Sequence, residues 1–208
     1  RAAWCRGSCP PTGAGDGGQG ISFSVGSNNS AIYSSRGYSN SSNGVELSTS
    51  KNNTLNNTFG QSNSSRGIFL LAASNSNVIA NSTGISNTSF GIEFSGSLFN
   101  NLTTSLATSL SEGGIYLTSD ANNNRFVKNT FVTSGLSGAL EYGANGGSNN
   151  QFFNTTLQSN VSWIKIEDIP TTNNTYNNTL FDSPNGSIRI SGNFTPPSGL
   201  ITIGLSNM

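Results

Sequence analysis

Short apolar strands alternate with polar segments at an almost constant interval along the chain. In each four-residue unit the second and fourth positions are apolar and the third varies, which places two side chains in a core and one outside it. Eight units occur: GISF (20–23), GVEL (44–47), GIFL (67–70), GIEF (91–94), GIYL (114–117), ALEY (139–142), WIKI (163–166) and SIRI (187–190). Their starts lie 24, 23, 24, 23, 25, 24 and 24 residues apart. Because a repeat of this length without a helical period buries its apolar side only against its neighbours, the pattern predicts a solenoid.

Two further segments recur within each repeat. An Asn-rich corner follows each strand, as expected because Asn tolerates left-handed backbone angles. A second strand is predicted directly after it, as in LNNTF (55–59) and VKNTF (127–131). Its central Asn is predicted to point inward and to stack over the next coil, since a stack of amides satisfies buried polar groups. A Ser- and Gly-rich stretch then returns the chain, which gives each coil three sides.

The combination of G-[IV]-x-[LF], an Asn corner and N-N-T-[FL] carries a family resemblance. It resembles the right-handed parallel β-helix repeats of the pectate-lyase-like superfamily, particularly the Asn- and Ser-rich versions of bacterial and archaeal surface proteins. The resemblance implies an all-β fold, a right-handed parallel β-helix (solenoid) of about eight coils with 23–25 residues per coil. It indicates the fold and not the activity, because the same scaffold carries lyases, hydrolases, adhesins and structural proteins.

One domain with two terminal extensions is predicted. Residues 1–19 form a Gly/Pro-rich N-terminal arm with a Cys pair, residues 20–191 the parallel β-helix, and residues 192–208 a C-terminal extension. The tail alternates like one more strand, so it is predicted either to fold back as an edge strand or to pair with a neighbouring subunit. The residues assigned to this assembly arm are Trp4, Leu200, Ile201 and Ile203.

Cys5 and Cys9 are the only cysteines of the chain. A local disulfide is the favoured interpretation and two free thiols are the alternative. A metal site would need two further soft ligands, which no other Cys and no His of this chain can supply. No metal and no other cofactor is therefore expected.

Charge and composition exclude several classes of partner. Lys and Arg number nine, Asp and Glu number nine, and the net charge is zero. Because nucleic acids and anionic membranes attract clustered Lys and Arg, neither is an expected partner. No apolar run approaches the roughly 20 residues that span a bilayer. The chain opens on Arg, so it is interpreted as a processed or truncated form of a protein that is extracellular or at the cell surface.

The outward position of the first strand forms the candidate contact face. Down the coils it holds Glu46, Phe69, Glu93, Tyr116, Glu141, Lys165 and Arg189. One interpretation is a sugar-binding or catalytic groove with Phe69 and Tyr116 as stacking platforms. The favoured interpretation is a solvated or protein-contacting face in which Glu141 pairs with Lys165. The chain has no His, the commonest general base, and its four Asp residues fall at unrelated repeat positions.

Fourteen N-x-[ST] sequons are present. Those predicted to lie in loops and corners, and therefore to be candidate glycosylation sites, are Asn28, Asn40, Asn63, Asn87, Asn160 and Asn185. Asn81 and Asn101 are instead assigned to the inward Asn column, where a glycan could not be attached.

The ends of the predicted solenoid indicate its use. No segment has the apolar period of a capping helix, although the ends of a solenoid expose open strand edges. We therefore expect a secreted structural subunit of an extracellular filament, sheath or surface layer, and not an enzyme. Copies of the chain are the expected partners, with covalent N-glycans as a second class. The alternatives are an adhesin or carbohydrate-binding β-helix and, third, a degenerate polysaccharide lyase or hydrolase.

Overall fold

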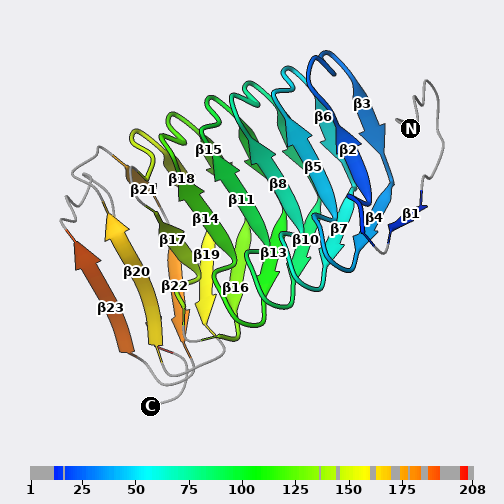
Figure 1. The fold of residues 1–208 in the computed structure, drawn as a ribbon. Coiled ribbons are helices and arrows are strands. Elements are labelled where there is room, and N and C mark those ends of the chain that lie inside the picture. Colours follow the sequence, from blue (N-terminus) through cyan, green and yellow to red (C-terminus); the bar gives the residue numbers. More distant parts are fainter. Residues whose placement is uncertain are drawn as a thin grey trace.

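The computed structural model is a three-sided parallel β-solenoid, with no helix among the residues it describes (Figure 1). These residues are 12–15, 17–135, 137–143, 146–159, 163–169, 174–177, 179–183, 187–192 and 202–205. The backbone alone is described for 12–15, 163–169, 187–192, 202–205, Asn177, Phe181 and Ser183. The all-β parallel β-helix predicted from the repeat is thereby confirmed.

Three sheets form the sides of the solenoid, and each sheet takes one strand from every turn. Sheet A contains β1 (Thr12–Gly15), β4 (Arg36–Ser39), β7 (Phe59–Ser62), β10 (Thr83–Ser86), β13 (Leu106–Ser109), β16 (Thr130–Thr133), β19 (Thr156–Ser159), β22 (Leu180–Ser183) and β24 (Thr202–Leu205). Sheet B contains β2 (Ile21–Phe23), β5 (Val45–Ser48), β8 (Ile68–Leu71), β11 (Ile92–Ser95), β14 (Ile115–Thr118), β17 (Leu140–Tyr142), β20 (Trp163–Ile169) and β23 (Ser187–Gly192). Sheet C contains β3 (Ala31–Tyr33), β6 (Thr54–Asn56), β9 (Val78–Ala80), β12 (Asn101–Thr103), β15 (Arg125–Val127), β18 (Gln151–Phe153) and β21 (Thr175–Asn177).

The eight apolar units of the sequence are the eight strands of sheet B. Strands β2 to β19 complete about six turns, so eight coils is slightly too many. Strands β20 and β23 continue sheet B, but the segments that follow them are only partly described. Two strands of sheet A lie outside residues 20–191, the predicted β-helix. β1 pairs in parallel with β4, and β24 pairs in parallel with β22.

The core lies between the three sheets and consists of the inward positions that the alternation predicts. Each sheet B strand from β5 to β14 buries its first and third residues completely, as Val45 and Leu47 do on β5. On sheet C the middle residue points inward, and Phe126, Phe152 and Tyr176 form a continuous ring stack with centroid distances of 4.6 and 4.9 Å. These stacked rings fill the part of the core next to sheet C.

Sheets A and B approach each other closely at β4, β7 and β10, where sheet A carries glycine at its inward position, which Ala107, Phe131 and Leu157 take in later turns. A Cβ atom on Gly60 would fall on the carbonyl oxygen of Gly67 and would also lie 2.9 Å from a side-chain carbon of Ile68. Gly37 and Gly84 meet the same kind of carbonyl oxygen in their own turns. A larger residue at these positions would push the start of a sheet B strand outward.

The segment predicted as the second strand is a corner. LNNTF does not form one strand, because Asn57 has a φ of 55° and separates β6 from β7. In VKNTF the corresponding corner residue is Lys128, the second of the five, with a φ of 55°. Left-handed backbone is costly for most residues but is accessible to Asn, so the chain turns from sheet C to sheet A at this point.

The predicted inward amide is present in VKNTF, where the central Asn129 is buried and its Oδ1 accepts the backbone N–H of Ser105 at 2.9 Å, but not in LNNTF. A longer ladder of amides lies at another position. Asn57 is exposed, whereas a buried Asn stands just before each sheet C strand from β6 to β21. The members of this ladder are Asn53, Asn77, Asn100, Asn124, Asn150 and Asn174. From Asn77 on, each Oδ1 atom accepts the backbone N–H of the Asn one turn earlier, at 2.8 to 2.9 Å, and Asn53 Oδ1 accepts that of Ser30 at 2.9 Å. The ladder therefore satisfies backbone donors that the corner leaves without a sheet partner.

Candidate functional site

The candidate contact face is in register on sheet B from β5 to β17. Glu46 lies beside Phe69, Phe69 beside Glu93, Glu93 beside Tyr116, and Tyr116 beside Glu141. Parallel strands are about 4.8 Å apart, so the three carboxylates occupy every second strand at roughly 10 Å. The column is therefore continuous, but its acids do not converge.

The column departs from the prediction after Glu141. Leu140 pairs with Ile166 and Glu141 pairs with Glu167, so the expected neighbour of Glu141, Lys165, lies two residues away along β20. A shift of two residues keeps every side chain on its own side of the sheet, which is why the alternation alone could not reveal it. Lys165 pairs with Arg189 on β23, and the side chains of both lie outside the described part.

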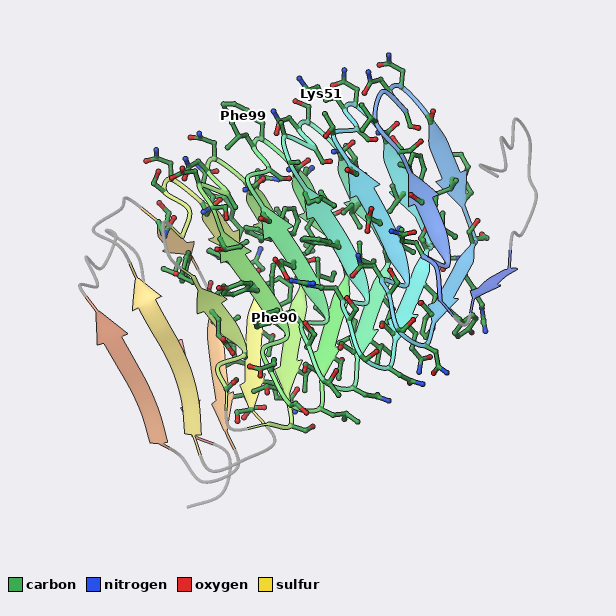
Figure 2. The ribbon with its side chains drawn as sticks, viewed as in Figure 1. Lys51, Phe90 and Phe99 are labelled. Atoms are coloured by element: carbon green, nitrogen blue, oxygen red, sulfur yellow. The ribbon has the colours of Figure 1, made fainter. Side chains whose placement is uncertain are left out.

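A second row of side chains covers this column. It consists of the residue two positions before each sheet B strand, at the corner between sheets A and B, and we call it the cover row. Its members are Gln19, Asn43, Arg66 and Phe90, followed by Gly113 in the next turn. Figure 2 shows Phe90 well away from Lys51 and Phe99, which lie along the upper rim at corners between sheets B and C.

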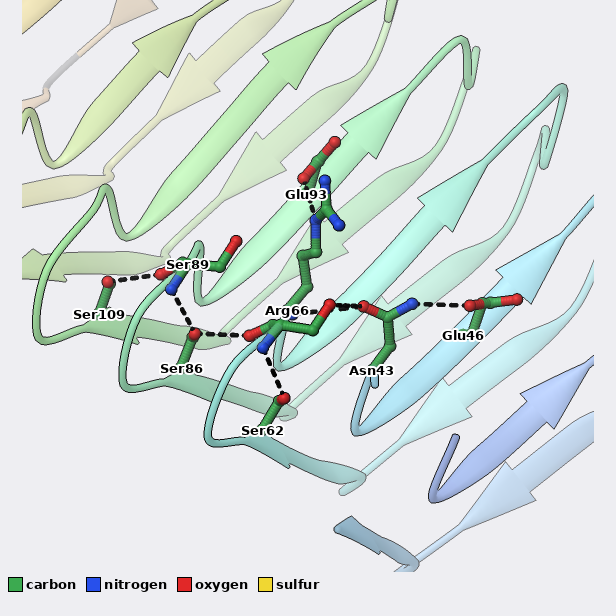
Figure 3. Close-up of polar contacts among 9 residues, drawn as sticks. Asn43, Glu46, Ser62, Arg66, Ser86, Ser89, Glu93 and Ser109 are labelled. Carbon is green, nitrogen blue, oxygen red and sulfur yellow. Dashed lines mark hydrogen bonds and ion pairs between the residues drawn. The ribbon is translucent and has the colours of Figure 1, made fainter. Parts of the chain in front are cut away.

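Serine hydroxyls hold the corners of the cover row to one another. Ser86 Oγ donates to the carbonyl oxygen of Ser65 at 2.5 Å and accepts the backbone N–H of Ser89 at 2.8 Å (Figure 3). Ser62 accepts the N–H of Ser65 in the same way, and Ser109 Oγ donates to the carbonyl oxygen of Ser89 at 2.5 Å. Because each corner is bonded to the next, the cover row stands at fixed intervals over sheet B.

The first carboxylate of the column is held by two amides. Glu46 Oε2 accepts hydrogen bonds from Asn43 Nδ2 at 2.6 Å and from Gln19 Nε2 at 3.1 Å. Asn43 Oδ1 in turn accepts from Ser65 Oγ at 2.7 Å and from the backbone N–H of Arg66 at 3.3 Å (Figure 3). Glu46 is thus tied to the corners of its own and the neighbouring turns.

The second carboxylate forms a shielded ion pair. Arg66 Nε lies 2.6 Å from Glu93 Oε2, and the side chain of Glu93 is only 3% exposed, against 35% for Arg66. The same guanidinium lies over the ring of Phe69, 4.7 Å from its centroid. Burial raises the pKa of Glu93 above its ordinary value, although the hydrogen bond and the charge of Arg66 act to lower it. The Arg66 side chain therefore covers the column in two successive turns, at Phe69 and at Glu93.

The last two residues of the column between β5 and β17, Tyr116 and Glu141, are shielded in different ways. Phe90 stacks on Tyr116 with a centroid distance of 4.1 Å and an interplanar angle of 10°. In the next turn the cover row holds Gly113, and a Cβ there would lie 2.9 Å from Glu141 Oε1. Glu141 occupies the space that a side chain would take and is 8% exposed.

The contact face is consequently a stripe in which Glu93 and Glu141 are buried while Glu46, Phe69 and Tyr116 are half-buried. Both rings that were candidate sugar platforms already have a partner, Arg66 over Phe69 and Phe90 on Tyr116. Sequence reasoning missed the cover row, although Asn43, Arg66 and Phe90 all precede the repeated Gly of their strand. The recurrence of a large side chain directly before this Gly is the signal from which the cover row could have been predicted.

The candidate glycosylation sites fall into three groups. Asn28, Asn40 and Asn63 are exposed and Asn87 is half-buried. Asn40, Asn63 and Asn87 stand one above another, because Asn63 Nδ2 donates to Asn40 Oδ1 and Asn87 Nδ2 donates to Asn63 Oδ1 at 3.0 Å. The remaining two candidates, Asn160 and Asn185, lie outside the described residues.

Two sequons were wrongly assigned to the inward column. Asn81 is exposed, has a φ of 49°, and its Nδ2 donates to Asn56 Oδ1 at 3.0 Å. Asn101 opens β12 and is half-buried, whereas the inward amide of that turn belongs to its neighbour Asn100. The order of the two adjacent asparagines at the corner decides which one points inward.

The terminal predictions fall largely outside the described part of the chain. Trp4, Cys5, Cys9, Leu200 and Ile201 are not described. Ile203 belongs to β24, where the backbone alone is described, paired with Phe181 of β22. The disulfide and the assembly arm therefore stay predictions.

The donor set of the described residues does not fit a transition-metal site. Copper and zinc sites use imidazole, thiolate and thioether ligands. The chain has no His, and its two Cys residues and single Met lie outside the described part. Among the described residues no three His, Cys, Asp or Glu side chains gather closely enough to hold a metal ion. The same part of the chain contains no helix long and apolar enough to cross a membrane.

Comparison with known proteins gives one match. A family model described as Periplasmic copper-binding protein (NosD) matches residues 12–164. The matched span runs from β1 into β20 and covers more than half of the 208 residues. No curated protein and no solved structure matches the chain.

Proposed function

The chain belongs to the NosD family, and on that premise we propose that it is a structural subunit outside the cytoplasm that assembles with copies of itself through the solenoid ends. The observation that carries the proposal is the open edge at the N-terminal end. Within the described part, β2 pairs only with β5, and β3 pairs only with β6. An open edge of this kind is a template for a strand of another chain.

The backbone of β2 has donors directed to that edge. Ile21 donates its N–H to the carbonyl oxygen of Gly44 at 2.9 Å. In a parallel sheet alternate residues bond to opposite neighbours, so the N–H of Ser22 is directed away from β5. A contact between the first turn of one copy and the last turn of another is heterologous, and repetition of it produces an open filament.

The long sides of the solenoid support a structural role over a catalytic one. Glu46, Glu93 and Glu141 are spaced at roughly 10 Å, and each is engaged by or packed on its own chain. Polysaccharide hydrolysis would require two carboxyl groups that converge on one bond. The proposal therefore includes no catalytic activity.

The family description also names copper and the periplasm. A periplasmic family is consistent with a place in the envelope or beyond it, and a filament, sheath or surface layer is the finer part of this proposal. We assign no copper-binding role to the solenoid, because its described residues do not fit a copper site. Glycans on the exposed Asn28, Asn40 and Asn63 are compatible with a structure whose sides face the exterior.

The adhesin alternative is weaker on the same grounds. A sugar-binding platform needs an accessible ring face, whereas Arg66 and Phe90 lie over the two rings of the column. Binding of glycans by the wild type, lost in Phe69→Ala and Tyr116→Ala variants that remain folded, would restore this alternative.

The proposal is tested by imaging the protein and by blocking the edge. Electron micrographs of the wild type should show filaments or ordered arrays, and sedimentation velocity should show species larger than a dimer. Ser22→Pro removes the edge N–H without touching the bonds to β5 and should shorten or abolish the assemblies. Ser22→Ala keeps the N–H and is the matched control. A wild type with no species beyond a dimer, or a Ser22→Pro variant that assembles as the wild type does, would overturn the proposal.

A further inference from the structure

The outward face of sheet A is regular and almost free of charge. Its strands remain in register from β1 to β24 without a shift. Two outward columns run along it. From β4 to β22 the first column holds Arg36, Phe59, Thr83, Leu106, Thr130, Thr156 and Leu180, and the second holds Tyr38, Gln61, Ile85, Thr108, Val132, Gln158 and Asp182.

Other charges of the described chain lie on the other two sheets or at corners, including Lys128 between sheets C and A and Arg66 and Glu112 between sheets A and B. Sheet B carries Glu46, Glu93 and Glu141, and Arg125 lies on sheet C. Lys51 lies at a corner between sheets B and C (Figure 2). On sheet A the two outward columns contain only Arg36 and Asp182. This segregation distinguishes the sheet A face as a surface that can be covered without burying many charges.

The two charges of this face lie on strands that are equally far from β13, although Arg36 belongs to the first column and Asp182 to the second. In the sheet order, β4 is the second strand from one end and β22 is the second from the other, with β13 in the centre. A two-fold axis along β13 would therefore lay β4 of one copy over β22 of another. Arg36 of each copy would stand over the strand that carries Asp182 of the other.

Several of the remaining positions match under the same symmetry. β10 would face β16, which pairs Ile85 with Val132 in the second column and Thr83 with Thr130 in the first. β7 would face β19, which brings the amide of Gln61 to that of Gln158. On β13 itself Leu106 would face Leu106 and Thr108 would face Thr108. The match is not complete, because Phe59 would face Thr156 and Arg36 would face Leu180.

We propose that the outward face of sheet A binds the same face of a second copy of this chain, around a two-fold axis parallel to β13. Arg36 is exposed and its Nη1 lies 3.4 Å from Tyr38 Oη, so its side chain extends from the first column toward the second. Asp182 of the second copy stands in that second column, two residues along the strand from the position facing Arg36 and hence about 6.6 Å away. Such an interface is isologous, and each charge contact occurs twice.

The size of the face sets the strength of the dimer. Seven strands at about 4.8 Å span roughly 30 Å, and four residues at about 3.3 Å span roughly 13 Å. The face therefore offers roughly 400 Å² on each copy, at the low end for a specific interface. We expect a weak dimer that forms at micromolar or higher concentration and loosens as salt screens the two ion pairs.

Charge reversal provides the first test, by sedimentation equilibrium in low and high salt. Arg36→Asp and Asp182→Arg should each raise the dimer dissociation constant by about tenfold or more, because each places like charges together twice. The double variant Arg36→Asp/Asp182→Arg should restore dimerisation. Arg125→Asp is the matched control, since Arg125 is also exposed and lies over a Phe ring, at 5.2 Å, but on sheet C. Failure of the double variant to dimerise, when it melts as the wild type does, would overturn the proposal.

Cross-linking tests the position of the axis. In a Cys5→Ser/Cys9→Ser background, Thr108→Cys places a thiol on the axis and should give a covalent homodimer with a short bismaleimide, since facing sheets lie about 10 Å apart. Thr130→Cys lies on the same face but faces Thr83, so it should cross-link to a Thr83→Cys protein and not to itself. Equal homodimer yields at positions 108 and 130 would exclude this symmetry. The interface does not use the solenoid ends, so Ser22→Pro should leave these dimers intact even where it abolishes filaments.

Discussion

Replacement of Asn100 by Ala tests how much the buried amide ladder contributes to stability. Asn100 is 1% exposed, and its Oδ1 accepts the backbone N–H of Asn77 at 2.8 Å and the Nδ2 of Asn77 at 3.1 Å. The variant leaves that backbone N–H without a partner inside the core, which costs about 1–3 kcal/mol, and loss of the amide bonds adds about 1 kcal/mol. We expect a loss of roughly 2–4 kcal/mol, a large part of the roughly 5–15 kcal/mol typical of a domain.

The measurement combines urea unfolding, followed by circular dichroism, with hydrogen exchange at Asn77. Exchange is needed because a repeat array can open locally and depart from two-state behaviour. Asn63→Ala is the matched control: Asn63 also exchanges amide bonds with the Asn one turn before and after it, but on the exposed surface. It should cost less than about 0.5 kcal/mol. Equal losses in the two variants, or an unchanged exchange rate at Asn77, would refute the reasoning.

Two further predictions concern a carboxyl group and a glycine. Because burial raises the pKa of Glu93 in the folded protein above its ordinary value of 4.5, its stabilising contribution is complete below that value and is lost as the pH rises through the folded pKa. Urea unfolding should show the wild type losing stability relative to Glu93→Gln as the pH rises above 4.5, and a difference independent of pH would contradict this. Gly60→Ala should destabilise by about 1–3 kcal/mol or more, because its Cβ falls on the backbone carbonyl of Gly67. Gly18→Ala meets nothing within 4 Å and serves as the control in thermal unfolding, where equal midpoints would contradict the prediction.

Sheet B was predictable because each of its strands shows two inward apolar positions around one outward position. The other two sheets were harder to separate, since a sheet C strand of three residues buries only its middle residue, such as Leu55. One apolar residue shows no alternation, so LNNTF was interpreted as one strand. The corner at Asn57 depends on a left-handed backbone angle, which Asn permits but does not require.

The inward amide is predicted correctly at Asn129 and wrongly at Asn57, and the longer ladder lies at the preceding corner. Each corner carries two or three adjacent polar residues, of which only one can face the core. At the first complete corner Asn52 takes the left-handed angle, with a φ of 56°, and remains exposed, which turns Asn53 inward. Both positions hold Asn, so the residue type does not decide which side chain faces the core. The backbone angle at Asn52 decides it.

The contacts on the outward surfaces join residues of different turns. This is why sequence reasoning missed the cover row. Arg66 and Glu93 are 27 residues apart, so a pattern within one repeat cannot show that the cover row of one turn closes over the column of the next. Once the register is known, however, a column can be followed strand by strand along the whole sheet. On sheet A this procedure places Arg36 and Asp182 at equal distances from β13. A register shift of one residue on any strand between them would turn its outward pair into the core, so the unbroken pairing from β4 to β22 is the condition under which that symmetry exists.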